Sequence, residues 1–276
     1  MHTDFELADG EYEFLRTFVY DHSGISLGEE KRQLLYSRLS KRLRKLSLSG
    51  FKEYCQLLKA GDKDEVLYFT NAITTNLTSF FRESHHFDYL ANTVLPDLMK
   101  LKSDSRKIRI WSAGCSTGEE PYSIAMTVKK VVPASWDVKI LATDLDSNVV
   151  ATGHAGVYDL ERVEGMDKAL LKKWFKKGSG VNKGKAIVNE ELKSIVSFRQ
   201  LNLMKDWPMK GLMDIIFCRN VVIYFDRPTQ SVLFNRYAKV MHPDGRLFVG
   251  HSESLLKVTD QFDLIGNTVY KKRVTV

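Results

Sequence analysis

The sequence has few residues of the kinds that mark secreted, zinc-binding or membrane-spanning proteins. Its 276 residues include three cysteines, Cys55, Cys115 and Cys218, and no two of them form a C-x-x-C pair. Disulfides and a structural zinc site are therefore not expected, and a reducing cytoplasm is the simplest location. No apolar run approaches the ~20 residues that a membrane-spanning helix needs, so direct membrane insertion is not expected.

Two phosphate-binding signatures are also missing, because the sequence contains neither G-x-G-x-x-G nor the G-K-[ST] of a P-loop. A strand-like run at 107–111 is followed instead by a turn between Gly114 and Gly118, and then by Glu119 and Glu120 at the start of a predicted helix. Nucleotide-like ligands lie at such turns in open α/β sheets. Glutamates in place of lysine or arginine favour a cationic or zwitterionic ligand rich in hydroxyls, such as S-adenosylmethionine. A sharp connection without a ligand is the alternative.

Residues 1–90 contain little strand signal and predict a small helical domain, with helices over 11–20, 28–46, 51–60 and 64–77. The second helix has a leucine stripe and no acidic residue between 31 and 46. The remaining face is basic and includes Arg38, Lys41, Arg42 and Lys45. With a net charge of +7, this face predicts docking to an acidic partner, although a solvated helix surface is the alternative.

A polar and aromatic segment, 74–83, precedes a predicted helix over 86–101, and Thr78 or Ser79 is a candidate N-cap for it. The adjacent pair His85-His86 has no cysteine or paired acid at ligand spacing, so no metal site is predicted there.

Residues 91–276 predict a mostly parallel, doubly wound α/β sheet. The expected strands are 107–111, 138–143, 195–201, 213–218 and 245–250, the expected helices are 119–132, 147–154 and 228–241, and a hairpin over 262–272 adds an edge strand. The stretch 155–194 is too long for a crossover and predicts an inserted antiparallel β-subdomain around a loop with Gly178, Gly180 and Gly184. Its free edge could accept a peptide strand, or the loop could be merely flexible.

Polar residues follow two of these strands. Asp144 and Asp146 end the second strand, where an acid commonly bonds ribose hydroxyls, and one of them could instead cap the next helix. Arg219 and Asn220 follow the fourth strand and are expected to face the glycine turn, with Tyr224 one helical turn further on, either at the site or in the core.

Four blocks, in matching order and spacing, closely resemble the chemotaxis receptor methyltransferases, the family usually called CheR. They are 71–83 (NAITTNLTSFFRE), 116–123 (STGEEPYS), 217–226 (FCRNVVIYFD) and 250–254 (GHSES). The resemblance covers nearly the whole chain. It implies a doubly wound seven-stranded methyltransferase sheet, a helical amino-terminal domain and a β-subdomain insert. It also implies transfer of methyl from S-adenosylmethionine to glutamate side chains of receptors in chemotactic adaptation.

The resemblance further assigns cofactor residues, which are Asn76, Thr78, Arg82, Gly114, Glu119, Asp144, Asn202, Leu203, Arg219 and Asn220. It implies Arg82 near the methionine carboxylate, Asp144 at the ribose and Tyr224 near the transferred methyl. Arg82 or Tyr224 is expected to orient the substrate carboxylate. The sequence departs from some members, which have alanines at Gly114-Cys115, but it keeps small side chains there.

The resemblance also implies a partner, the cytoplasmic domains of chemoreceptors. Some members tether a receptor C-terminal pentapeptide, of the Asn-Trp-Glu-Thr-Phe kind, through the β-subdomain. The glycines at 178, 180 and 184 favour this type, and a flexible turn is the alternative. We expect a cytoplasmic monomer that does not bind nucleic acid.

A glutamate carboxylate, with a pKa of about 4.3, is already ionised at neutral pH, so the implied reaction needs positioning and no general base. The pI of about 9.1 makes a nucleic-acid methyltransferase the main rival. Enzymes that methylate base amino groups usually carry an Asn/Asp-Pro-Pro-Tyr/Phe run after the fourth strand, where this sequence has Cys218-Arg219-Asn220-Val221. The Pro-Cys nucleophile of cytosine-C5 enzymes is also absent. A non-catalytic binding module is the second rival, but every cofactor position is filled.

Overall fold

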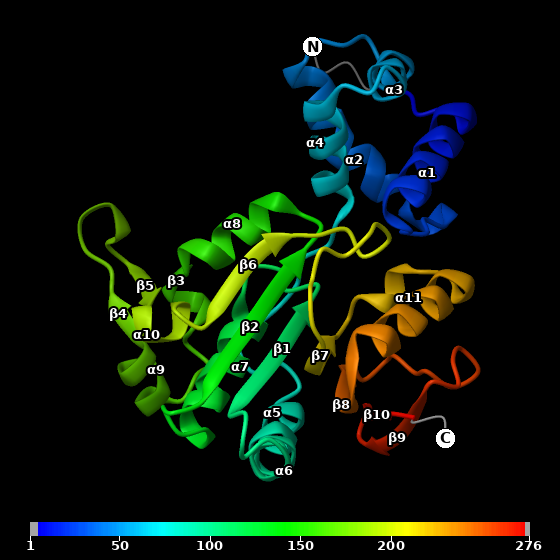
Figure 1. The fold of residues 1–276 in the computed structure, drawn as a ribbon. Coiled ribbons are helices and arrows are strands. Elements are labelled where there is room, and N and C mark those ends of the chain that lie inside the picture. The colour runs from blue at the N-terminus through cyan, green and yellow to red at the C-terminus, as the bar shows by residue number, and fades with distance from the viewer. Residues whose placement is uncertain (1–4, 274–276) are drawn as a thin grey trace.

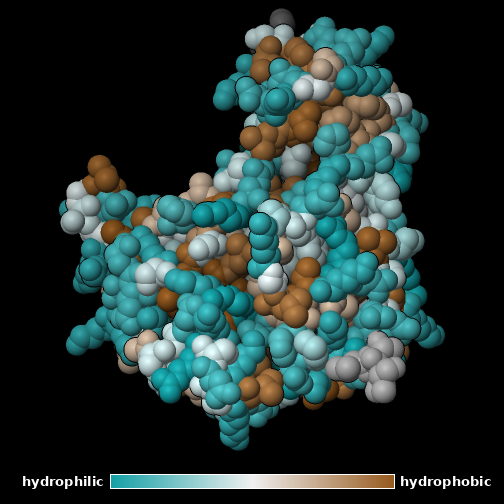
Figure 2. Space-filling view, viewed as in Figure 1, coloured by the Kyte–Doolittle hydropathy of each residue, from teal (hydrophilic) through white to brown (hydrophobic). Residues whose placement is uncertain are grey.

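The computed structural model describes residues 5–273 and consists of a helical domain that stands on one end of a larger sheet domain (Figure 1). Hydrophilic residues cover most of the visible surface, and hydrophobic residues appear in separate patches on both domains (Figure 2). Within the described residues, no helix has the length and apolar character needed to cross a membrane.

The helical domain packs its amphipathic helices around one apolar interior. Its elements are α1 (Asp9–Ser23), η1 (Glu29–Lys31), α2 (Arg32–Lys45), α3 (Phe51–Lys59) and α4 (Lys63–Ile73). The predicted leucine stripe is confirmed, since Leu35, Leu39 and Leu43 are buried. The predicted extension of α4 to residue 77 is wrong: the helix ends at Ile73 because Thr74 is extended and its hydroxyl bonds the Asp146 carboxylate at 3.0 Å.

The next helical segment belongs by packing to the sheet domain. It comprises α5 (His85–Tyr89), a π-helical turn η2 (Leu90–Val94) and α6 (Leu95–Leu101). Neither Thr78 nor Ser79 caps it, because 74–79 has no helical structure and the helix starts at His85. Phe80, Phe87 and Leu90 are buried in the core of the sheet domain, so the end of the segment expected in the 1–90 domain packs against the sheet.

The sheet domain contains the predicted seven-stranded sheet, in the order β6-β2-β1-β7-β8-β10-β9. Its strands are β1 (Lys107–Ala113), β2 (Asp137–Asp144), β6 (Val196–Gln200), β7 (Met213–Cys218), β8 (Met241–Val249), β9 (Phe262–Gly266) and β10 (Val269–Lys272). The strands from β6 to β8 are parallel, whereas β10 and β9 pair antiparallel. The predicted hairpin is confirmed and forms the edge of the sheet.

Alternating side chains divide the sheet between two cores, because successive residues of a strand point to opposite faces. On β7, Ile215 and Phe217 contribute to one core, whereas Ile216 and Cys218 contribute to the other. The second of these cores continues into the helical domain. The covering helices are α7 (Glu119–Val131), α8 (Ser147–Ala155) and α11 (Arg227–Val240).

The predicted insert is confirmed as a three-stranded antiparallel sheet at the far side of the molecule from the C-terminal hairpin (Figure 1). It comprises β3 (Val157–Asp159), η3 (Leu160–Arg162), α9 (Lys168–Trp174), β4 (Phe175–Lys177), η4 (Gly180–Asn182), β5 (Lys185–Val188) and α10 (Glu190–Lys193). Strand β5 is central, so β3 and β4 are both edges. A hydrophobic group stands at the tip of the β4–β5 loop (Figure 2), where Val181 is 99% exposed.

Candidate active site

The strand order runs from β1 to β2 and β6 on one side of the sheet and from β1 to β7 and β8 on the other. In such open sheets a ligand-binding crevice lies at the switch point, here between the carboxyl ends of β1 and β7. The turn after β1 and the loop after β7 touch there: a Cβ on Gly114 would lie 2.3 Å from the Val221 Cγ2 atom. Gly114 also has a φ of +88°, in the left-handed region that glycine adopts without strain. Glycine is therefore required at 114 by both space and backbone conformation.

A cavity opens at this crevice and extends toward the helical domain, so its walls come from both domains and from the segment that joins them. Nine of the ten predicted cofactor residues line it, as does Tyr224: Asn76, Thr78, Arg82, Gly114, Asp144, Asn202, Leu203, Arg219 and Asn220. Residues far apart in the sequence thus converge on one cavity.

The two aspartates after β2 have separate roles. Asp146 is the N-cap of α8, accepting the Asn148 N–H at 2.9 Å, and it also holds the Asn76 side-chain amide at 2.9 Å. Asp144 lines the cavity and accepts the Ser116 N–H at 2.8 Å. Burial raises the pKa of Asp144. The cap is confirmed for Asp146, and Asp144 is the aspartate that faces the ligand space.

Glu119 is the predicted cofactor residue that the structure places elsewhere. Its side chain is fully buried, accepts the Thr117 hydroxyl at 2.6 Å and pairs with Arg162 of the insert at 3.1 Å. The next residue, Glu120, lines the cavity instead. Adjacent helical residues point about 100° apart, so only one of the two can face a given ligand. Glu120, and not Glu119, is therefore the glutamate of this pair that faces the cavity.

Arg219 lies next to Glu120 in the cavity wall, between two carboxylates. Its guanidinium is 3.1 Å from Glu120 Oε2 and 3.2 Å from Glu83 Oε2. Burial raises the pKa of Glu120, and the charge of Arg219 offsets only part of this increase. Arg219 is itself buried. For Glu83, burial is outweighed by the hydrogen bond from His251 and the charge of Arg219, which lower its pKa to about 2. Arg219 thus lines the cavity and also stands at the centre of an ion-pair network.

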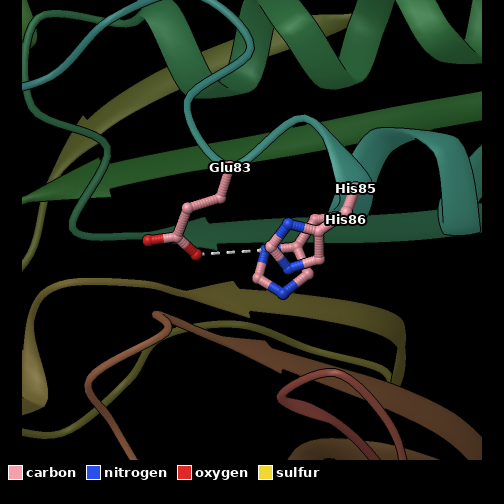
Figure 3. A group of neighbouring side chains, drawn as sticks. All are labelled: Glu83, His85 and His86. Atoms are coloured by element: carbon pink, nitrogen blue, oxygen red, sulfur yellow. Dashed lines mark ion pairs between the residues drawn. The ribbon is translucent and has the colours of Figure 1, made fainter.

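Glu83 also brings together the one group of side chains, within residues 5–273, that has the spacing of a metal site: Glu83, His85 and His86 (Figure 3). The acid lies two residues before the histidine pair, which the sequence reading overlooked. Glu83 Oε2 is 3.5 Å from His86 Nδ1, but the Arg219 guanidinium contacts the same oxygen. Burial and the Arg219 charge lower the pKa of His86 to about 4. We therefore assign this cluster to the ion-pair network.

Tyr224 and Arg82, the two candidate residues for orienting the substrate, both line the cavity. Arg82 donates to the Leu77 carbonyl at 2.9 Å. Burial raises the pKa of the Tyr224 phenol, while the charges of Arg82 and Arg38 oppose that shift. The phenol therefore remains a hydrogen-bond donor at neutral pH.

The other end of the cavity is bounded by Asn202 and Leu203. The Asn202 side-chain amide donates to the carbonyl of His22 at the end of α1, and its oxygen accepts the Met204 N–H at 2.8 Å. Leu203 is buried and offers an apolar surface. This wall is therefore fixed to the helical domain.

The basic face of α2 is only partly free. Arg38 donates to the carbonyls of Ala72 at 2.9 Å and Thr74 at 2.8 Å. Arg42 pairs with the buried Glu65 of α4. The sequence reading gave this face no acidic partner because the acid comes from another helix. Two of the predicted docking residues thus have internal contacts, whereas Lys41 and Lys45 are exposed, as is Arg44.

The glycines of the insert are explained by its own loop. A Cβ on Gly178 would lie 1.9 Å from the Asn182 carbonyl oxygen, and Gly180 and Gly184 have φ values of +56° and +83°. Their presence is therefore accounted for without a bound peptide.

Sequence reasoning missed several residues at this site. Glu120 could have been weighed against Glu119 by helix direction, and Glu253, which binds the loop after β7, stands in the noted block 250–254. Lys31 and Leu34 line the cavity from the helical domain, and no local pattern marks them.

Comparison with known proteins agrees with this geometry. Residues 76–271 match the CheR methyltransferase SAM binding domain, and residues 10–74 match the CheR methyltransferase all-alpha domain. Chemotaxis protein methyltransferase 2 of Pseudomonas aeruginosa is 47% identical, with 97% of this chain and 94% of the relative covered. A probable chemotaxis protein methyltransferase of Rhizobium etli is 45% identical, over 92% of this chain and 96% of the relative. The chemotaxis protein methyltransferase of Escherichia coli is 40% identical, over 96% and 91%.

Both domain matches together span most of the chain, and the cavity lies where they join. The chain belongs to the CheR methyltransferase family and is an S-adenosylmethionine-dependent methyltransferase.

Proposed function

We propose that this chain transfers methyl from S-adenosylmethionine to glutamate side chains of chemoreceptor cytoplasmic domains, forming methyl esters in chemotactic adaptation. The observation that carries the proposal is a cavity shared by two domains. One wall carries the residues suited to the cofactor, and the other, with Lys31 and Leu34, belongs to the helical domain. An acidic protein side chain can enter between them.

The lining residues have the chemistry that the cofactor requires. Asp144 offers carboxylate oxygens to the ribose hydroxyls of the cofactor. Glu120 offers negative charge to the ammonium group of its methionine part, and Arg82 offers positive charge to the carboxylate of that methionine part. Leu203 provides an apolar surface for the adenine ring. The close approach of Gly114 to Val221 keeps the floor of the cavity narrow.

When bound, S-adenosylmethionine supplies a methyl group on a positively charged sulfur. The chain's part is to bring the glutamate carboxylate in line with that methyl and to hold it there. Arg82 and the Tyr224 phenol are donors for one carboxylate oxygen, which leaves the other free to attack. Among the described residues, no histidine or cysteine lines the cavity, as expected for a nucleophile that is already ionised.

The test is transfer of labelled methyl to a panel of receptor cytoplasmic fragments, with nucleic acid as a parallel acceptor. We expect label in the receptor fragment that is released by mild base, as from an ester. Base-stable label in RNA or DNA would instead favour the rival activity. Labelling of neither acceptor, with S-adenosylhomocysteine still bound, would leave a methyltransferase with a different substrate.

We also propose that the exposed basic residues of α2, Lys41, Arg44 and Lys45, form the receptor-docking surface. Their charges are not engaged as those of Arg38 and Arg42 are. An acidic helical bundle is the kind of partner that fits them. As expected from the family resemblance, we further propose that the chain acts as a monomer in the cytoplasm.

The insert is the proposed site for a receptor C-terminal pentapeptide, bound as an added strand on β3 or β4. Its support is the two open edges, together with the exposed Lys177 and Lys183 near β4 and the exposed Val181 at the loop tip. Tethering would raise the local concentration of enzyme near the methylation sites. Calorimetric titration should detect binding of the pentapeptide and none of a scrambled peptide. Absence of a binding signal for both peptides at millimolar concentration would refute tethering.

A further inference from the structure

The block at 250–254 carries a buried carboxylate that the cofactor does not explain. Glu253 is 4% exposed and does not line the cavity. Its two oxygens accept backbone N–H groups from Gly250 at 2.6 Å, Asn220 at 2.8 Å, and Val221 and Val222 at 2.9 Å each. One side chain thus binds both the end of β8 and the loop after β7.

That loop has backbone groups that need such a partner. Asn220 has a φ of +57°, a left-handed conformation that is uncommon for residues other than glycine. The chain then turns through η5 (Val222–Tyr224), whose first amides have no earlier carbonyl to bond. A carboxylate can accept four hydrogen bonds on its two oxygens, and a neutral side chain of the same size cannot.

The glycine at 250 makes the arrangement possible. A Cβ there would lie 2.6 Å from the Asn220 Nδ2 atom and 2.9 Å from Glu253 Oε2. The end of β8 can therefore sit against the loop only without a side chain. The far end of the loop is held separately, because the Ser26 N–H donates to the Tyr224 carbonyl at 2.8 Å.

We propose that Glu253 is a positioning residue for methyl transfer. Its carboxylate fixes the start of the 220–224 loop, so that Asn220 faces the cavity and Tyr224 stands at its reacting end, without Glu253 touching either reactant. This role rests on the proposed function for the acceptor, but the geometry of the loop does not depend on which acceptor is used.

The test compares Glu253→Gln with Glu253→Asp. Glutamine keeps the size but has one acceptor oxygen, and its NH2 group opposes the backbone N–H groups on the other side. Aspartate keeps the charge and both oxygens at a shorter reach. Calorimetry with S-adenosylhomocysteine counts the competent sites, and kcat is expressed per competent site. A displacement of about 1 Å can cost roughly 100-fold in rate, so we expect a loss of 10-fold to 100-fold for Glu253→Gln, a smaller loss for Glu253→Asp, and an unchanged KM for the receptor fragment.

Hydrogen exchange supplies a readout that needs no acceptor. In Glu253→Gln, the amides of Asn220, Val221 and Val222 should exchange faster while those of β7 stay protected. Val138→Ala is the matched control, because Val138 is buried at the amino end of β2 and should lower Tm without loosening the loop.

Wild-type kcat per competent site in Glu253→Gln, or unchanged exchange of the loop amides, would overturn the proposal. So would an equal loss of kcat in Val138→Ala, since the effect would then be global. If the wild-type protein methylates no receptor fragment, the proposed function fails, whereas the exchange measurement still tests whether Glu253 holds the 220–224 loop.

Discussion

Replacement of Asp144 by alanine tests the assignment of the cofactor site most directly. Asp144 ends β2, lines the cavity and is held in place by the Ser116 N–H at 2.8 Å and the Asp146 N–H at 3.1 Å. A hydrogen bond to a charged group contributes about 1.5–3 kcal/mol. Loss of the ribose contact should therefore weaken binding of S-adenosylhomocysteine by roughly 10-fold to 150-fold.

Isothermal titration calorimetry measures this loss, and the same strand offers a control. Asp137, at the opposite end of β2, pairs with Arg109 at the surface. Exposed pairs contribute about 0–1 kcal/mol to stability, so Asp137→Ala should leave the affinity for S-adenosylhomocysteine unchanged. Near-UV circular dichroism checks that both variants are folded. Wild-type affinity in a folded Asp144→Ala variant would refute the ribose assignment.

The pH dependence gives a second check on the same residue. Burial raises the pKa of Asp144, so its carboxylate is present above that raised value and is lost as the pH falls through it. The affinity difference between wild type and Asp144→Ala should accordingly shrink in acid, beginning above the pKa of about 3.9 of an ordinary aspartate. A difference that stays constant down to that pH would contradict the buried, ionised carboxylate.

Three further predictions concern other parts of the molecule. Gly114→Ala should lower the stability by about 1–3 kcal/mol and should also weaken S-adenosylhomocysteine binding. The reason is that residue 114 has a φ of +88° and that a Cβ there would overlap the loop after β7. An affinity equal to that of the wild type would contradict this prediction. The pKa of His86 is lowered to about 4 in the folded protein, whereas it is about 6.5 in the unfolded chain. As the pH falls from about 6.5 to 4, the unfolded chain binds a proton that the folded protein does not, so about 3 kcal/mol of stability should be lost over this range. Urea unfolding across this range should show a flatter profile for His86→Gln but not for the exposed His85→Gln. Reversing Lys41 and Lys45 to glutamate should raise the KM for receptor roughly threefold to tenfold at low salt, with cofactor affinity unchanged, and a loss that persists in high salt would argue against docking.

The sequence was sufficient for the features that depend on local pattern. The bounds of β7 match the prediction at both ends, and the turn from Gly114 to Gly118 connects β1 to α7 as expected. Hydrophobic alternation and turn glycines act over a few residues, which is why they can be read without the fold. Of the nine predicted residues that line the cavity, Gly114, Asp144, Arg219 and Asn220 were also indicated by the turn and the strand ends, whereas the others came from the family resemblance.

The choice of side-chain partners could not be predicted in the same way. Glu119 pairs with Arg162 of the insert and Glu120 with Arg219 of the loop after β7, and both partners lie far away in the sequence. Arg42 is neutralised by Glu65 of another helix, which the composition of α2 alone could not reveal. These contacts depend on tertiary packing.

The segment that ends α1 has a consequence for exchanging parts between relatives. Ile25 forms an antiparallel bridge with Phe225, and the Tyr20 hydroxyl donates to Asp226 at 3.0 Å. A chimera that took its helical domain from one parent and its sheet domain from another would split this joint. A graft intended to redirect receptor choice should therefore carry 20–26 and 224–226 from the same parent, as one interlocking unit. Chimeras that respect this joint should accept foreign helical domains more readily than those cut at the domain boundary alone.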